Sequence, residues 1–251
     1  MPGRRSLLSV LAAALMIFAG ATARATDIQV AVAANFTAPA REIADAFAQA
    51  TGHKAVLSFG ASGQFYTQIS QGAPFEVFLS ADAERPQKAE QAGLAVAGTR
   101  FTYALGRLVL FSKTAGLVDD QGTVLKAGNF EKLAIADPAA APYGVAAMQT
   151  MDKLGVAASL KPKLVTGQSI IQTYQFIATG AAELGFVALS QVVNETGGSR
   201  WVVPRESHAA IEQQAVLLKR GESNEAAKAF LAFLKDPQAL AVIRQYGYEA
   251  D

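Results

Sequence analysis

Patterns typical of strands alternate with patterns typical of helices from residue 28 onward, and this alternation limits the fold more than any other feature of the chain. Three strand-to-helix units fit into about 65 residues, with strands expected at 28–32, 54–59 and 76–80. We expect the first helix to begin at Pro39 and Asp82 to be the N-cap of the third. Such a series favours a parallel sheet with helices on both faces.

A second α/β series follows two extended apolar stretches, at 101–105 and 108–112, which are typical of a crossing between two lobes. It predicts strands at 133–136, 163–166 and 184–189, and then a later strand at 213–219 followed by two helices, at 223–235 and 237–246. The predicted fold class is α/β, with two doubly wound sheets joined by a two-crossing hinge and a cleft between them. We place lobe 1 at residues 26–106 and 209–251, and lobe 2 at residues 107–208.

The first 25 residues have the layout of a cleaved secretory signal. Arg4 and Arg5 precede an apolar run at 7–19, and the segment ends in Ala23-Arg24-Ala25, a small-x-small cleavage pattern. A run of about 13 residues is shorter than the roughly 20 that a membrane-spanning helix requires. The paired arginines also resemble a twin-arginine export signal, so two export routes stay open. We expect a soluble mature protein in the periplasm.

Composition excludes several kinds of partner and site. The chain has no cysteine, which rules out disulfides, thiolate metal sites and a cysteine nucleophile. Of its 22 basic residues three lie in 1–25, so 19 basic side chains remain against 21 acidic ones in the mature chain, a net charge of −2. Such a body has no bulk attraction for nucleic acid or an anionic membrane. We expect no nucleic-acid partner and no cofactor.

Motifs of enzymes are missing from the sequence. It contains no G-x-S-x-G, S-x-x-K, H-E-x-x-H, P-loop or G-x-G-x-x-G motif. His53 and His208 are its only histidines, and each is expected at the surface. Four carboxylates lie near predicted strand ends, and each is explained as a cap, turn former or solvated group: Glu76, Asp82, Asp137 and Glu183. We expect no catalytic residues.

Small residues and neutral hydrogen-bond donors recur at four strand-to-helix junctions. These are Ala34-Asn35, Ala61-Ser62-Gly63, Pro142-Tyr143-Gly144 and Gln168-Ser169-Ile170. Ligands of doubly wound sheets bind at such junctions, where helix N-termini offer free N–H groups to an anion. Asn35 and Ser62 have an equally simple explanation as N-caps. Two such junctions from each lobe nevertheless predict an anion site in the cleft.

The junctions carry no Lys or Arg, which limits the kind of anion. A fully deprotonated tetrahedral dianion has only acceptors, so neutral donors can hold it. Monohydrogen phosphate also requires an acceptor for its proton. Molybdate, tungstate or sulfate is therefore favoured over phosphate.

Several motifs resemble those of the periplasmic molybdate-binding proteins that serve ABC transporters. They are Val32-Ala33-Ala34-Asn35-Phe36, Ser58-Phe59-Gly60-Ala61-Ser62-Gly63, residues 72–82 (GAPFEVFLSAD), Ala136-Asp137-Pro138 with Pro142-Tyr143-Gly144, Leu184-Gly185-Phe186-Val187, and Tyr246-Gly247-Tyr248. The resemblance extends over the whole mature chain and implies the two-lobed periplasmic binding protein fold. It also implies an oxyanion held by hydroxyls, amides and backbone N–H groups.

The resemblance transfers a ligand set to Asn35, Ser62, Tyr143 and Ile170, with Ile170 acting through its N–H. These residues would contact the oxygens of the anion, without direct ligands to the metal. Many relatives have a serine at the position of Asn35, which keeps a side-chain donor. Several have a ligand-contacting tyrosine where this chain has Ala188, and Tyr143 could supply that hydroxyl instead.

The function implied by the resemblance is the capture of molybdate, and of tungstate, for an inner-membrane ABC permease by a monomeric protein. Two alternatives stay open. One is a binding protein for sulfate, chromate or another tetrahedral oxyanion, and the other is a secreted enzyme on the same scaffold.

Overall fold

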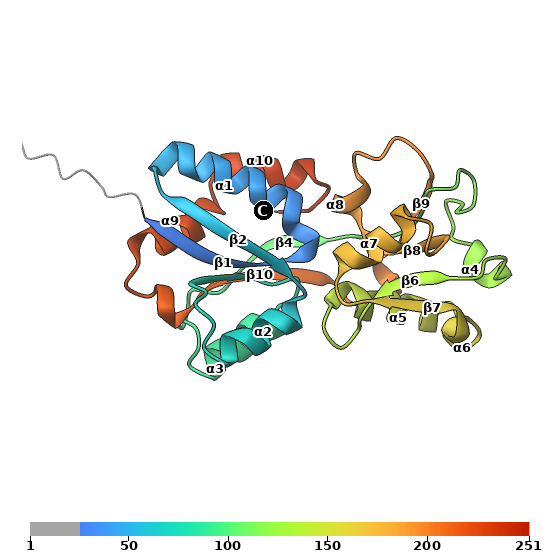
Figure 1. Ribbon diagram of the computed structural model, residues 1–251, viewed down its shortest axis with the longest axis horizontal. Coiled ribbons are helices and arrows are strands. Elements are labelled where there is room, and N and C mark those ends of the chain that lie inside the picture. Colours follow the sequence, from blue (N-terminus) through green and yellow to red (C-terminus); the bar gives the residue numbers. More distant parts are fainter. Residues whose placement is uncertain (1–25, 251) are drawn as a thin grey trace, which may run out of the picture.

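The computed structural model describes residues 26–250, which form two α/β lobes side by side (Figure 1). The signal predicted for residues 1–25 lies outside the described residues. Within residues 26–250 no helix is long and apolar enough to cross a membrane.

Lobe 1 is built on a five-stranded sheet with the order β2-β1-β3-β10-β4. Its strands are β1 (Asp27–Ala33), β2 (Lys54–Gly60), β3 (Val77–Leu79), β4 (Phe101–Gly106) and β10 (Ile211–Leu217). Its helices are α1 (Thr37–Thr51), α2 (Ser62–Ser70), α3 (Glu84–Gln91), α9 (Glu225–Phe233) and α10 (Pro237–Gln245), with 3₁₀ turns η1 (Ala34–Phe36) and η4 (Lys219–Gly221). α1 and α10 cover one face of the sheet, and α2 and α3 cover the other (Figure 1).

Lobe 2 has a second five-stranded sheet with the order β7-β6-β8-β5-β9. The strands are β5 (Leu108–Ser112), β6 (Leu133–Ala136), β7 (Leu164–Gly167), β8 (Leu184–Ala188) and β9 (Ser199–Val202). The helical segments are α4 (Val124–Ala127), α5 (Pro142–Lys153), α6 (Ala157–Leu160), η2 (Lys161–Lys163), α7 (Ile170–Ala178) and α8 (Leu189–Val192). α5 and α7 lie on opposite faces of this sheet (Figure 1).

The chain crosses twice between the two sheets. Only Arg107 separates β4 in the first sheet from β5 in the second, and the return from β9 to β10 passes through η3 (Arg205–Ser207). We propose that these two connections form the hinge, with lobe boundaries at 106/107 and 208/209.

Alternating side chains of the strands build separate cores on the two faces of each sheet. In β1, Val30 and Val32 pack with α1 and α9, whereas Ala31 packs with α2. The rings of Phe47 in α1 and Phe230 in α9 meet edge to face at a centroid distance of 5.2 Å. This double burial explains the apolar runs seen in the sequence.

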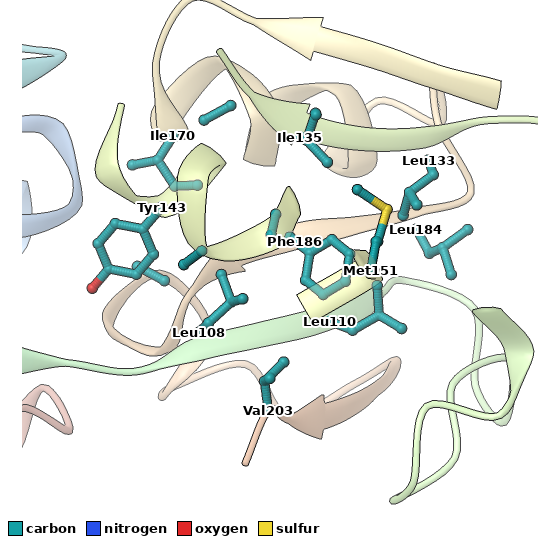
Figure 2. Packing of buried hydrophobic residues seen from close by; sticks show 14 of the residues in the cluster. Leu108, Leu110, Leu133, Ile135, Tyr143, Met151, Ile170, Leu184, Phe186 and Val203 are labelled. Carbon is teal, nitrogen blue, oxygen red and sulfur yellow. The ribbon is translucent and has the colours of Figure 1, made fainter. Parts of the chain in front are cut away.

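The lobe 2 core on the α5 side is shown in Figure 2. Leu110 of β5, Ile135 of β6 and Phe186 of β8 project toward Met151 of α5, and all four side chains are buried. This core holds α5, and with it the start of that helix, against the sheet.

The predicted α/β fold class is confirmed, and β1 runs parallel to β2 and β3, as β6 does to β7 and β8. Each sheet as a whole is nevertheless mixed and not purely parallel. β10 runs antiparallel to β3 and β4, and β5 runs antiparallel to β8 and β9. Each of these strands adjoins a crossing, so its direction is set by the hinge and not by a strand-helix-strand unit. β9 was not predicted as a strand, because it is short and only its Trp201 is buried.

Two helix starts also differ from prediction. α1 begins at Thr37 and not at Pro39. Proline is tolerated there because first-turn N–H groups have no partner within a helix. Asp82 is not the N-cap of α3, a position held by Ala83, although its Oδ1 accepts the N–H of Arg85 at 3.0 Å.

Truncation of Phe186 tests this core. We expect Phe186→Ala to lower the free energy of unfolding by about 3 to 5 kcal/mol, because it leaves a cavity among side chains that cannot collapse onto it. Urea denaturation followed by circular dichroism measures the change. Val202→Ala, in the same sheet at a side chain 40% exposed, is the control and should cost less than about 1 kcal/mol. Equal losses in the two variants would contradict the assignment of this core.

Candidate functional site

Junctions from both lobes meet at one small pocket. Its lining comes from the ends of β1 and β2, η1, the segment that follows β3, and the starts of α2, α5 and α7: Ala33, Ala34, Asn35, Gly60, Ala61, Ser62, Ala81, Ala141, Pro142, Tyr143 and Ile170. The structure therefore brings together all four predicted site residues, Asn35, Ser62, Tyr143 and Ile170.

The topology explains why these segments converge. β1, β2 and β3 are parallel, and so are β6, β7 and β8, so the carboxyl ends of each set share one edge of their sheet. A helical segment begins after each of these ends, with no more than five residues between, and its first N–H groups have no acceptor within the helix. Several helix N-termini, each with a partial positive charge, therefore surround the pocket.

No lysine, arginine, histidine, aspartate or glutamate lines this pocket. The groups facing it are backbone amides, hydroxyls, one side-chain amide and small apolar surfaces. An occupant would be held by neutral donors alone, and a cation would find no counter-charge. The pocket suits a small anion with many acceptors.

Ser62 is the first residue of α2 and is 1% exposed. Its Oγ accepts the N–H of Ala81 at 2.9 Å, which leaves the hydroxyl proton available to another acceptor. The N-cap of α2 is Ala61, so the explanation of Ser62 as an N-cap is wrong. Ser62 can offer the pocket both its hydroxyl and its N–H.

Asn35 lies in η1, and its side chain is tied into the protein. Its Nδ2 donates to Gln213 Oε1 at 2.8 Å and to the hydroxyl of Tyr248 at 2.9 Å. Both amide protons therefore have acceptors, and the N-cap of α1 is Phe36 and not Asn35. The donor that Asn35 can offer the pocket without breaking these bonds is its backbone N–H in the first turn of η1.

The peptide of Asn35 also joins the two lobes. Its carbonyl accepts hydrogen bonds from Ser190 Oγ of lobe 2 and from the Tyr248 hydroxyl of lobe 1, each at 2.8 Å. Sequence reasoning assigned no role to Gln213, Ser190 or Tyr248. Of the three, only Tyr248 belongs to one of the motifs described above. They lie 155 to 213 positions from Asn35, so no local pattern in the sequence indicates that they contact it.

Tyr143 follows Pro142 at the start of α5 and is 2% exposed. Gln213 Nε2 donates to its hydroxyl oxygen at 3.5 Å. A Cβ on Gly106 would lie 2.3 Å from that oxygen, so the ring reaches the hinge end of β4 and requires glycine there. Burial, and then the nearby Tyr248 and Tyr103, raise the pKa of Tyr143 well above 10.0, so the phenol stays protonated and able to donate.

Ile170 is the first residue of α7 and has a buried side chain. Ser169 is the N-cap, and its Oγ accepts the N–H of Gln172 at 3.4 Å, which leaves the N–H of Ile170 without an acceptor in its helix. Ala188, at the end of β8, is fully buried in the same cluster as Tyr143 and Ile170.

The four carboxylates noted in the sequence all have structural partners. Glu76 accepts the N–H of Gln29, Asp137 the N–H of Ala139, Glu183 the N–H groups of Glu131 and Lys132, and Asp82 the hydroxyl of Ser80. Partial burial acts to raise the pKa of Glu183, but backbone hydrogen bonds and the charge of Lys132 together outweigh it and lower that pKa below its usual value. Across residues 26–250 no group of three or more acidic or histidine side chains is arranged to hold a metal ion.

Comparisons with known proteins agree with this architecture. The family described as bacterial extracellular solute-binding protein matches residues 28–249. The molybdate-binding protein ModA of Rhodobacter capsulatus is 58% identical over 94% of both chains, and that of Azotobacter vinelandii is 56% identical over 90% of this chain and 91% of its own. The solved periplasmic molybdate-binding protein of Azotobacter vinelandii superposes with a TM-score of 0.86 at 41% identity, covering 89% of this chain and 99% of that one.

The buried tyrosines behind the pocket predict loss of stability at alkaline pH. Burial raises the pKa of Tyr103 and Tyr143 well above 10.0 and that of Tyr248 to about 12. Between pH 10 and about 12 the unfolded chain loses these protons while the folded chain keeps them, so stability falls as pH rises. The slope should reach about 3 to 4 kcal/mol per pH unit for three groups.

Urea denaturation at pH 9 to 11.5 measures this slope. Tyr248→Phe removes one of the three titrating groups and should reduce the slope by about 1.4 kcal/mol per pH unit. An unchanged slope in that variant would show that Tyr248 does not keep its proton in the folded protein.

Proposed function

This chain belongs to the bacterial extracellular solute-binding proteins, and from that premise we propose that it captures molybdate and delivers it to an ABC permease. One observation carries the proposal, namely a small pocket between two hinged lobes whose lining contains neutral donors and no charged residue. The relatives above, at 58% and 56% identity, are named for molybdate. We extend the proposal to tungstate, which has the same charge and tetrahedral shape.

We propose that Asn35 and Ser62 of lobe 1 and Tyr143 and Ile170 of lobe 2 hold the oxygens of the anion, with no residue bound to the metal itself. Ser62 would donate through its hydroxyl and N–H, Asn35 and Ile170 through their N–H groups, and Tyr143 through its N–H and its protonated hydroxyl. Tyr143 would thereby supply the hydroxyl that several relatives provide from a tyrosine at the position of Ala188. Support comes from the lining of the pocket and from the free first-turn N–H groups.

Binding follows from closure of the lobes. In an open cleft each lobe presents half of the donors, and an anion that reaches one half draws the other half onto it. Closure removes water, which strengthens each charge-assisted hydrogen bond. The closed face then identifies a loaded protein to the permease. We propose that the protein works as a soluble periplasmic monomer and performs no catalysis.

Selectivity among anions follows from a pocket that offers hydrogen-bond donors and no carboxylate to accept a proton from the ligand. We expect phosphate at pH 7 to bind at least about a hundredfold more weakly than molybdate, a difference of about 2.7 kcal/mol, because the proton of monohydrogen phosphate would find no carboxylate to accept it. Calorimetric titration with molybdate, tungstate, sulfate, chromate and phosphate measures the order. Equal titration curves for phosphate and molybdate would refute the proposed donor set. If sulfate or chromate bound more tightly than molybdate, that anion would be the substrate instead.

Substitutions at Ser62 test the proposed coordination. Ser62→Ala should weaken molybdate binding about 5-fold to 150-fold, since one oxygen of the anion loses its donor in a dry cleft. Ser62→Asp should weaken it far more, because a carboxylate would face a dianion. Ile170→Leu should bind like the parent, because only its N–H is used.

Ser70→Ala is the matched control, because Ser70 ends the same helix, is exposed and bonds only the carbonyl of Thr67 in its own helix. Loss of the acceptor for Ala81 N–H makes Ser62→Ala less stable by about 1 to 3 kcal/mol, so folding is checked by thermal unfolding before titration. Parent-like affinity in Ser62→Asp would place the anion elsewhere.

A further inference from the structure

A turn of lobe 2 docks onto the beginning of two helices in lobe 1. The N–H of Gly63, second residue of α2, donates to the carbonyl of Ala140 at 2.9 Å. Arg85 Nη2, from α3, donates to the neighbouring carbonyl of Ala139 at 3.2 Å. This turn, residues 137–141, leads directly into α5 and so into Tyr143.

The approach at Gly63 is tighter than most Cβ atoms meet, so a side chain there would push the turn away by a few tenths of an ångström. A Cβ there would lie 3.0 Å from the carbonyl oxygen of Ala140 and 3.1 Å from its Cα. Gly63 is not among the glycines with positive φ, so its backbone conformation is open to other residues. Glycine is therefore favoured at this position by the contact with the turn and with Arg85 Nη2, and not by the helix to which it belongs.

Arg85 is positioned within lobe 1 before it meets lobe 2. Its Nη1 forms an ion pair with Asp82 Oδ2, and Asp82 Oδ1 accepts the N–H of Arg85 and the hydroxyl of Ser80. The ionic pair is mostly shielded, with side chains 17% and 19% exposed. The N–H of Gly63 and the guanidinium of Arg85, both fixed in lobe 1, thus donate to two consecutive carbonyls of lobe 2.

We propose that Gly63 and Arg85 form a clasp on the turn 137–141 that sets how long the anion stays bound, although neither residue touches it. The proposal rests on the proposed function. The first two residues of α2 have different partners: Ser62 lines the pocket, and the N–H of Gly63 donates to the turn. When the turn binds to Gly63 and Arg85, it brings Tyr143 toward the anion. The turn must separate from these two residues before the anion can leave. Both are positioning residues.

The first test adds one methyl group at Gly63, which should impair closure of the lobes without impairing folding. Gly63→Ala should raise the dissociation rate of molybdate at least tenfold and leave the association rate within twofold, measured by stopped-flow chase with tungstate. Its melting temperature without ligand should equal or exceed that of the parent, because alanine favours the helix. Gly197→Ala, at a glycine with no atom near its Cβ position and ordinary φ, is the matched control with parent-like rates.

The second test addresses Arg85. Arg85→Ala should raise the dissociation rate about fivefold, and Lys88→Ala, one turn along the same helix at an exposed residue paired with Glu84, should not. In the double variant Gly63→Ala with Arg85→Ala, the effects should combine to less than their product, because both residues hold one turn. A purely structural role would lower the melting temperature of the free protein and leave the two rates unchanged.

Closure itself is measured by energy transfer between dyes at Ser70→Cys and Ser159→Cys, one exposed site in each lobe of a chain without cysteine. Gly63→Ala should reduce the closed fraction with and without molybdate. Parent-like transfer and dissociation in Gly63→Ala, with tight molybdate binding by the parent, would overturn the clasp and leave the proposed function intact. A parent that fails to bind molybdate would instead refute the proposed function, and transfer in the free protein would still decide the clasp.

Discussion

The free backbone N–H at a helix start is the group on which the proposed anion site depends. Each lobe supplies such N–H groups at the carboxyl edge of its parallel strands, and the two edges face each other across one pocket. The sheets, the double crossing and the covering helices all serve to hold these edges in place. A side-chain cation would bind more strongly but would also bind more kinds of anion, so neutral donors favour selectivity over strength.

Behind the pocket, a buried polar network makes the neutral site rigid. Gln213 is fully buried, and its Oε1 accepts from Asn35 Nδ2 at 2.8 Å and from the Tyr103 hydroxyl at 3.1 Å. Its Nε2 lies 3.5 Å from the hydroxyl of Tyr143, so one amide connects proposed ligand residues of both lobes. None of the buried side-chain polar atoms of residues 26–250 lacks a hydrogen-bond partner. A network satisfied in this way has one preferred arrangement, which keeps the donors aimed at the pocket.

Two contacts between the lobes lie next to residues that line the pocket. Ser190 donates to the carbonyl of Asn35, and Ala140, beside Ala141, accepts the N–H of Gly63, beside Ser62. The residues that face the pocket are thus neighbours of the residues that join the lobes. We therefore expect occupancy and closure to be coupled through shared backbone segments and not through a distant relay.

The sequence by itself determined the α/β class, the order of most strands and helices, and the four junctions that carry Asn35, Ser62, Tyr143 and Ile170. Periodicity and junction chemistry are local, so they can be read from a short window. Tertiary structure alone decided the antiparallel placement of β10 and β5, the engagement of both amide protons of Asn35, and the direction of the Tyr143 hydroxyl. The two side-chain arrangements depend on Gln213 and Tyr248, which lie 178 and 213 residues from Asn35 and meet it only after the chain has crossed the hinge twice. A hydrogen bond between such distant residues leaves no periodic trace in the sequence.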